Sequence, residues 1–143
     1  MVQYLFPGIQ RRFAGNNRWK RLQKLHRTQK SYLGKAVDIR IDRPIGSTHP
    51  KHPDLTYPIN YGYIEEIIAP DGEEQDAYVL GVDKPVEEFS GVVIAIVHRY
   101  DDVEEKWVVA PENMSFTKEE IMEQVRFQEK YFKSEVRIWW SGR

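Results

Sequence analysis

The chain of 143 residues contains no cysteine. Disulfide bonds, zinc–thiolate sites, iron–sulfur clusters and a cysteine nucleophile are therefore excluded. Long apolar runs are missing as well: the longest covers residues 92–97, whereas a membrane helix needs about 20 residues. The first residues also lack the apolar segment of a secretory signal. We therefore expect a cytoplasmic protein without a membrane partner.

Acidic residues are absent from the first quarter of the chain. Residues 1–37 hold nine Lys and Arg and no Asp or Glu, which leaves 12 of the 21 basic residues and all 22 acidic ones to residues 38–143. The formal net charge of −1 is therefore the sum of a basic segment and a body of net charge −10. These two parts of the chain require separate interpretations.

The basic part is interpreted as an N-terminal extension, residues 1–31, that is flexible or partly helical. Within it, Trp19, Leu22, Leu25 and His26 recur at helical spacing between basic residues. A helix of this kind would bind nucleic acid, anionic lipid or the acidic body of the same chain. The alternative is a solvated extension with no partner.

Residues 32–143 predict one domain that is mainly β with a single helix. Short aromatic and β-branched runs between turn residues predict strands at 37–41, 57–68, 77–80, 92–98, 106–109 and 136–140. Thr117 and Glu120 have the spacing of a capping box, and the helix that they open has an apolar face with Ile121, Val125 and Phe132. Residues 43–54 are expected to form a loop. This order of elements predicts a small antiparallel, OB-like β-barrel with a C-terminal helix packed on it.

Three polar groups stand at the ends of predicted strands, where a barrel would bring them together. Two are acidic, at 71–76 and 101–106, and carboxylates are the ligands that Mg²⁺ prefers. Each acidic segment alone is also compatible with a solvated turn. The third group is cationic and phenolic and suits an anionic ligand; it consists of Arg43, His49, Lys51, His52, Tyr57 and Arg99.

Two of these segments carry a resemblance to a known family. The stretch 56–64 reads Thr-Tyr-Pro-Ile-Asn-Tyr-Gly-Tyr-Ile, and 71–76 reads Asp-Gly-Glu-Glu-Gln-Asp. Together they resemble the soluble family I inorganic pyrophosphatases, in which a Tyr-Pro-x-Asn-Tyr-Gly-Tyr-Ile strand leads into Asp-Gly-Asp-Pro-x-Asp. Residues 101–111 are similar to the second acidic loop and following strand of that family, and 127–131 to its Phe-Phe-Glu-x-Tyr segment.

The resemblance implies Mg²⁺-dependent hydrolysis of pyrophosphate and assigns roles by position. It implies that two or more Mg²⁺ ions are held by Asp71, Glu73, Asp76, Glu104 and either Asp101 or Asp102. It implies phosphate contacts from Tyr57, Lys106 and Tyr131, with Arg43 and Lys51 as further cations chosen by their place in the loop. The catalytic set is then Glu73, Asp76, Lys106 and Tyr57, whereas Asn60 and Tyr61 are expected to support the site. The resemblance also leaves a homo-oligomer open.

Several positions depart from the family pattern. Glu73 and Glu74 stand where Asp and Pro are usual, and Arg40 stands where the family carries a metal-side Glu. The longer Glu side chain can keep a metal while misplacing a water molecule, and an error of 1 Å can cost on the order of 10²-fold in rate. Two alternatives therefore remain: a hydrolase of another phosphoanhydride, and a non-catalytic barrel that binds phosphate or nucleic acid. For the acidic site itself we expect no nucleic-acid partner.

Overall fold

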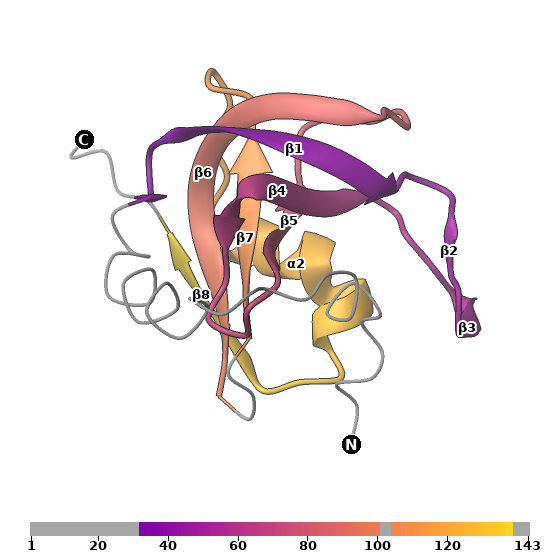
Figure 1. Cartoon of the computed structure of the whole chain (residues 1–143). Helices are drawn as coiled ribbons and strands as arrows, with labels where there is room; N and C mark the ends of the chain where they lie inside the picture. The colour runs from indigo at the N-terminus through magenta and orange to yellow at the C-terminus, as the bar shows by residue number, and fades with distance from the viewer. Residues whose placement is uncertain (1–31, 101–103, 139–143) are drawn as a thin grey trace.

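The computed structural model describes residues 32–100 and 104–138 (Figure 1). The basic extension and residues 139–140 of the last predicted strand lie outside these ranges. The described elements are β1 (Ala36–Arg43), β2 (Thr48–His49), β3 (His52–Thr56), β4 (Asn60–Ile68), β5 (Glu74–Val79), β6 (Glu88–Arg99), β7 (Glu105–Ala110), α2 (Lys118–Glu129) and β8 (Ser134–Ile138).

Five strands close into a barrel. The sheet order is β1-β4-β5-β7-β6, β6 pairs back onto β1, and β8 is added to β6. The predicted small OB-like barrel with a C-terminal helix is thereby confirmed. One pairing corrects the expectation of a wholly antiparallel barrel: β5 and β7 are parallel. The chain crosses the barrel in β6 between them and returns in β7, so β5 and β7 run in the same direction.

Alternate residues of the central strands enter two different cores. Ala77 on β5 and Trp107 on β7 belong to the cluster inside the barrel. Tyr78 and Val108, their neighbours in sequence, belong to a second cluster, which includes Ile121 of α2. Successive side chains of a strand point to opposite faces, so both faces of β5 and β7 are covered. This is why these strands are apolar over several consecutive residues.

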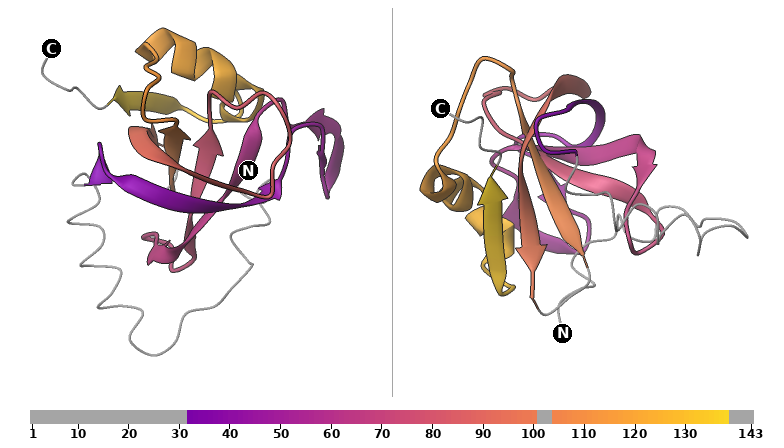
Figure 2. Two further views of the ribbon diagram at one scale, coloured as in Figure 1. Left: turned by 90° about the horizontal axis from the view of Figure 1, so that it is seen from above. Right: turned by 90° about the vertical axis from the view of Figure 1, so that its left-hand side faces the viewer.

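The helix begins where the sequence predicts. The Thr117 hydroxyl accepts a hydrogen bond from the Glu120 backbone N–H at 3.1 Å, and the Glu120 carboxylate accepts one from the Thr117 N–H at 2.8 Å. The buried face of α2 lies on one side of the barrel next to β8 (Figure 2). Phe132, predicted on the apolar face, lies beyond the last helical residue, and the face continues instead with Gln128 and Glu129. No helix in the described ranges has the length and apolar character needed to cross a membrane.

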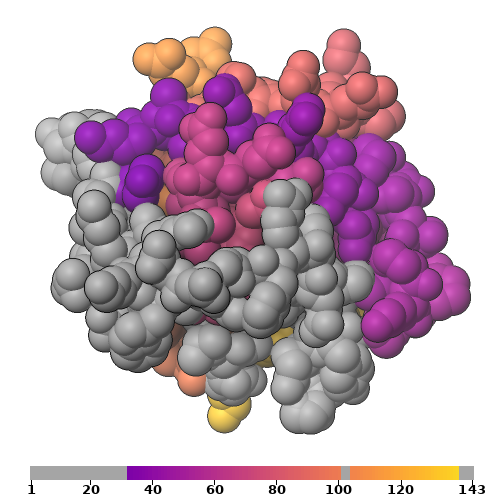
Figure 3. Space-filling model, in the orientation of Figure 1, coloured from indigo at the N-terminus to yellow at the C-terminus, as the bar shows by residue number. Residues whose placement is uncertain are grey.

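The predicted loop at 43–54 contains a short hairpin. Thr48 pairs with Thr56 and His49 with His52, and the loop is further tied by a bond from the Tyr57 N–H to the Ser47 carbonyl at 2.9 Å. The hairpin projects from the barrel beside β1 and β4 (Figures 1 and 3). These strands were not predicted because the segment contains Pro50 and Pro53, and Pro is confined to the edges of sheets.

Gly62 lets β1 and β4 approach each other closely. A Cβ atom at this position would overlap the carbonyl oxygen of Arg40 on β1. A side chain there would therefore separate the two strands. This explains the Gly inside the aromatic stretch of β4 as a packing requirement of the barrel.

Candidate active site

Two parallel neighbours, β5 and β7, bring the two acidic segments together. Tyr78 aligns with Val108, so Asp76 and Lys106 lie side by side two residues earlier. The Lys106 ammonium contacts Asp76 Oδ2 at 2.8 Å, and its side chain is 1% exposed. Burial lowers the pKa of Lys106, but the charges of Asp76 and Glu104 outweigh it and hold that pKa above its usual value. Lys106 is therefore a buried, charged group.

Glu104 completes this ion cluster from the start of β7. Its Oε1 accepts a hydrogen bond from Arg99 Nη1 at 3.0 Å and forms an ion pair with Lys106 Nζ at 3.2 Å. Its Oε2 is buried and has no hydrogen-bond partner among the described residues. Burial raises the pKa of Glu104 to about 7; Lys106 and Arg99 oppose that rise, and Asp76 and Asp71 add to it.

The turn before β5 supplies the other carboxylates. Gly72 has a φ of 91°, a conformation that glycine adopts without steric cost. Asp71 Oδ1 accepts a bond from the Glu73 backbone N–H at 2.9 Å, and Glu73 itself is buried. One small pocket, called here the β5–β7 pocket, is lined by Asp71, Glu74, Asp76, Glu104, Glu105 and Lys106. Glu74, rather than Glu73, faces this pocket.

Tyr57 and Arg43 form a cationic and phenolic group close to Lys106. Burial raises the pKa of Tyr57 to about 12, although the charges of Arg43 and Lys106 oppose that rise. The Tyr57 hydroxyl is therefore protonated at neutral pH and donates to Gln128 Oε1 at 3.0 Å. Arg43 is mostly buried and also lies 3.5 Å from Asp42. Arg43, Lys106 and the Tyr57 hydroxyl are therefore placed to contact an anion that binds beside the carboxylates.

A buried polar network joins this group to the end of α2. Gln128 donates to the Tyr78 hydroxyl at 2.8 Å, and that hydroxyl donates to Glu129 Oε2 at 2.7 Å. Glu129 in turn accepts two bonds from Arg99, at 3.0 and 2.7 Å. Burial would raise the pKa of Glu129, but the hydrogen bonds and charge of Arg99 outweigh it and lower that pKa.

Some predicted site residues lie elsewhere or outside the described ranges. Lys51 is exposed in the turn of the β2–β3 hairpin and does not line the β5–β7 pocket. Tyr131 follows α2, is 45% exposed and has Lys130 Nζ 5.5 Å from its ring centroid. Asp101 and Asp102 lie outside the described residues.

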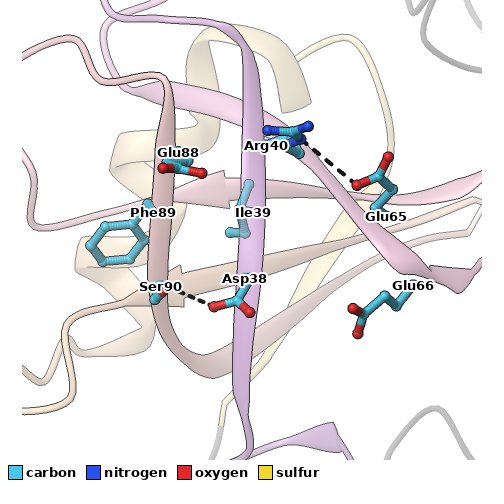
Figure 4. A pocket seen from close by; sticks show the side chains of 8 residues that line it. All are labelled: Asp38, Ile39, Arg40, Glu65, Glu66, Glu88, Phe89 and Ser90. Carbon is cyan, nitrogen blue, oxygen red and sulfur yellow. Dashed lines mark hydrogen bonds and ion pairs between the residues drawn. The ribbon is translucent and has the colours of Figure 1, made fainter.

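Arg40, which replaces an acidic family residue, does not line this pocket. Together with Glu65, at 3.7 Å, it lines a larger pocket on the outside of the barrel, called here the β1 pocket (Figure 4). Arg40 pairs with Tyr63 of β4, and Tyr63 pairs with Asp76 of β5, so Arg40 lies on the same outer face of the sheet as Asp76 but two strands away. Within the described structure, Arg40 therefore places no charge in the β5–β7 pocket.

Several polar residues near the site were not predicted from the sequence. Gln128 and Glu129 continue the spacing of Ile121 and Val125 on the buried face of α2. Polar residues at such positions are a signal, since buried polar groups need partners. Tyr61 was expected only to support the site, yet its buried hydroxyl has no hydrogen-bond partner among the described residues, and Lys106 Nζ lies 5.8 Å from its ring centroid.

Comparison of the whole fold with known proteins identifies its class. The inorganic pyrophosphatase from Ehrlichia chaffeensis superposes with a TM-score of 0.59 at 17% sequence identity, over 75% of this chain and 88% of its own. The chain has the fold of the inorganic pyrophosphatases. The pyrophosphatase from Neisseria gonorrhoeae gives a TM-score of 0.53 at 18% identity, over 73% of this chain and 81% of its own. No protein-family model matches the chain, and no curated protein matches it.

The donor set of the β5–β7 pocket suits a hard divalent cation. Its acidic groups offer carboxylate oxygens, the ligands of Mg²⁺, and Glu104 Oε2 is a buried oxygen with no partner in the described part of the chain. Within residues 32–100 and 104–138, no three acidic or His residues are grouped tightly enough to hold an ion as they stand. Lys106 contacts both Asp76 and Glu104, so its ammonium offsets part of their charge in this arrangement.

Proposed function

We propose that this protein is an inorganic diphosphatase that hydrolyses pyrophosphate to two phosphates with the help of Mg²⁺. The observation that carries the proposal is the meeting of both acidic segments with a buried lysine at the parallel β5–β7 pair of a pyrophosphatase fold. The solved structures of this fold compared above are inorganic pyrophosphatases. Because these structures are similar to the chain in fold but low in sequence identity, they establish only the fold. The proposed activity therefore rests on the residues of the pocket.

In this proposal the carboxylates hold the cations and the other polar groups bind the substrate. Asp71, Asp76 and Glu104 are the proposed ligands, with Glu73 and Asp101 or Asp102 as further candidates. Mg²⁺, when bound, lowers the pKa of a coordinated water so that hydroxide is available near neutral pH. Water adds to one phosphorus, the bond to the bridging oxygen breaks, and two phosphates result.

Substrate charge is neutralised by groups that already lie together. Lys106 is proposed to turn from Asp76 and Glu104 toward a phosphate oxygen, which its flexible side chain allows. Arg43 and the Tyr57 hydroxyl donate to other phosphate oxygens, as would the Tyr61 hydroxyl. Phosphoryl transfer depends mainly on positioning and electrostatic stabilisation, and this set supplies both. Lys51 and Tyr131 remain proposed phosphate contacts.

The test is phosphate release from pyrophosphate by purified protein. We expect activity with Mg²⁺ that is lost in excess EDTA and restored by added Mg²⁺. The matched control is Asp76→Asn, which keeps the size of the side chain and removes its charge. If the wild-type protein releases no more phosphate than Asp76→Asn at any Mg²⁺ concentration, the proposal is wrong.

A second function is favoured by one observation. Lys106 contacts Asp76 and Glu104, the carboxylates that would hold the ions. A barrel that binds phosphate without hydrolysing it would have this property. Calorimetric binding of phosphate to a protein with no hydrolytic activity would support this alternative, and a panel of nucleotides and short polyphosphates would reveal another phosphoanhydride substrate.

The proposed enzyme acts on a small molecule in the cytoplasm, without a nucleic-acid or membrane partner. A homo-oligomer is a further prediction, which light scattering of the full chain would check.

A further inference from the structure

Arg99 is a buried cation to which neither the family resemblance nor the proposed reaction assigns a role. It ends β6 and is fully buried. Its guanidinium forms a two-point contact with Glu129 through Nε at 3.0 Å and Nη2 at 2.7 Å, and Nη1 donates to Glu104 Oε1 at 3.0 Å. The guanidinium carbon also lies 3.7 Å from the centroid of the Phe132 ring.

These contacts determine the direction of the third nitrogen. A guanidinium is planar and rigid, so fixing two of its nitrogens on one carboxylate also fixes the third. Glu129 is itself held by donors from Tyr78 and Ser134, at 2.7 and 2.6 Å. Nη1 therefore meets Glu104 from a position that the end of α2 determines.

The consequence for Glu104 is that its two oxygens have different environments. Oε1 is contacted by both Arg99 and Lys106, whereas Oε2 has no hydrogen-bond partner in the described part of the chain. Glu104 lines the β5–β7 pocket. A donor that anchors one oxygen of a metal-binding carboxylate orients the other oxygen toward the ion.

We propose that Arg99 is a positioning residue that holds Glu104 through Oε1, leaves Oε2 for a divalent cation, and so couples that ligand to the end of α2. The inference rests on the proposed function only in taking Glu104 as a cation ligand. The competing explanation is purely structural: Arg99 would then serve only to balance the buried charge of Glu129. The two explanations differ in what happens when both partners are neutralised together.

The experiment compares Arg99→Met, Arg99→Lys, the double variant Arg99→Met/Glu129→Gln, and the control Arg126→Met, which changes an exposed arginine of α2. The full-length proteins are titrated with Mn²⁺ and with Mg²⁺ by calorimetry, without substrate, and their melting temperatures are measured. Phosphate release is then followed over a range of Mg²⁺ concentrations.

We expect Arg99→Met to bind Mn²⁺ about 10- to 100-fold more weakly, as is typical when a partner of a metal ligand is lost. Arg99→Lys should lie between it and the wild type, because lysine keeps the charge but not the two-point geometry. The double variant should recover melting temperature, since no buried charge is left without its partner, but not Mn²⁺ affinity. High Mg²⁺ should restore much of the kcat of Arg99→Met, and Arg126→Met should match the wild type throughout.

Two results would overturn the inference: wild-type Mn²⁺ affinity in Arg99→Met, or recovery of Mn²⁺ affinity together with melting temperature in the double variant. If Arg99→Met does not fold, Arg99→Lys and the double variant still decide. A wild-type protein that binds Mn²⁺ but hydrolyses nothing would refute the proposed function. It would leave the role of Arg99 supported if the affinity pattern holds.

Discussion

Two pockets of this molecule are lined by the same kinds of residue, several carboxylates and one basic side chain. The β5–β7 pocket gathers carboxylates around Lys106, and the β1 pocket gathers carboxylates around Arg40 (Figure 4). In the first, Lys106 lies 2.8 Å from Asp76, and the two side chains are 1% and 7% exposed. In the second, Arg40 lies 3.7 Å from Glu65, and the side chains are 58% and 52% exposed.

The difference lies in the solvent around the charges. Water weakens the interaction of exposed charges and competes for their hydrogen bonds, so such pairs contribute little. Buried charges interact strongly and are costly to separate. Charge composition alone therefore does not distinguish a reactive site from a solvated surface, and each of the following substitutions is paired with its counterpart in the β1 pocket.

The largest difference is expected for the cations. Lys106→Met removes the ammonium between two buried carboxylates and should lower the free energy of unfolding by about 3–5 kcal/mol. Arg40→Met should change it by at most about 1 kcal/mol. Urea unfolding of both variants measures this. Equal effects would mean that burial does not separate the two pockets energetically.

The carboxylates should differ in activity. Glu104→Gln removes a proposed cation ligand and should lower kcat/KM for pyrophosphate by about 10²-fold, which corresponds to about 2.7 kcal/mol. Glu66→Gln, in the β1 pocket, should leave kcat/KM unchanged. Steady-state phosphate release at saturating Mg²⁺ checks both variants. An equal loss of kcat/KM in Glu66→Gln would assign a function to the β1 pocket.

Hydroxyl groups provide a smaller contrast in stability. Tyr57→Phe removes the donor to the buried Gln128 Oε1 and should cost about 1–2 kcal/mol. Ser90→Ala removes a hydroxyl that donates to the exposed Asp38 carboxylate and should cost less than about 0.5 kcal/mol. Thermal unfolding of the two variants measures both changes in stability. If Tyr57→Phe leaves the stability unchanged, another group must donate a hydrogen bond to Gln128 Oε1 in its place.

The smallest expected difference concerns the stability of the protein at acidic pH. The pKa of Glu129 is lowered in the folded protein relative to about 4.3 in an unfolded chain. Its ionised form therefore adds stability above pH 4.3, which is lost as the pH falls through the folded value. The stability difference between wild type and Glu129→Gln should shrink below about pH 4, whereas Glu65→Gln, which breaks only an exposed ion pair, should change the stability little at neutral pH. Urea unfolding at several pH values tests this.

Much of the fold could be predicted because its signals are local. The capping box at Thr117 involves residues three positions apart, and the apolar run 92–97 marks β6 whatever surrounds it. The acidic turn at Asp71 and the aromatic stretch of β4 were likewise visible as patterns. The β2–β3 hairpin was not, because its prolines are poor strand formers and its pairing depends on the barrel beside it.

The amino-acid sequence by itself determined where the helix and the strands other than β2 and β3 form, which segments are acidic, and the resemblance that points to a pyrophosphatase fold. Only the tertiary structure decided that Asp76 meets Lys106, that Arg40 lies outside the β5–β7 pocket, and that Arg99 joins Glu104 to α2. The physical reason is distance along the chain. Asp76 and Lys106 are 30 residues apart, and their contact depends on the parallel register of β5 and β7, which the closed barrel sets and no local pattern encodes.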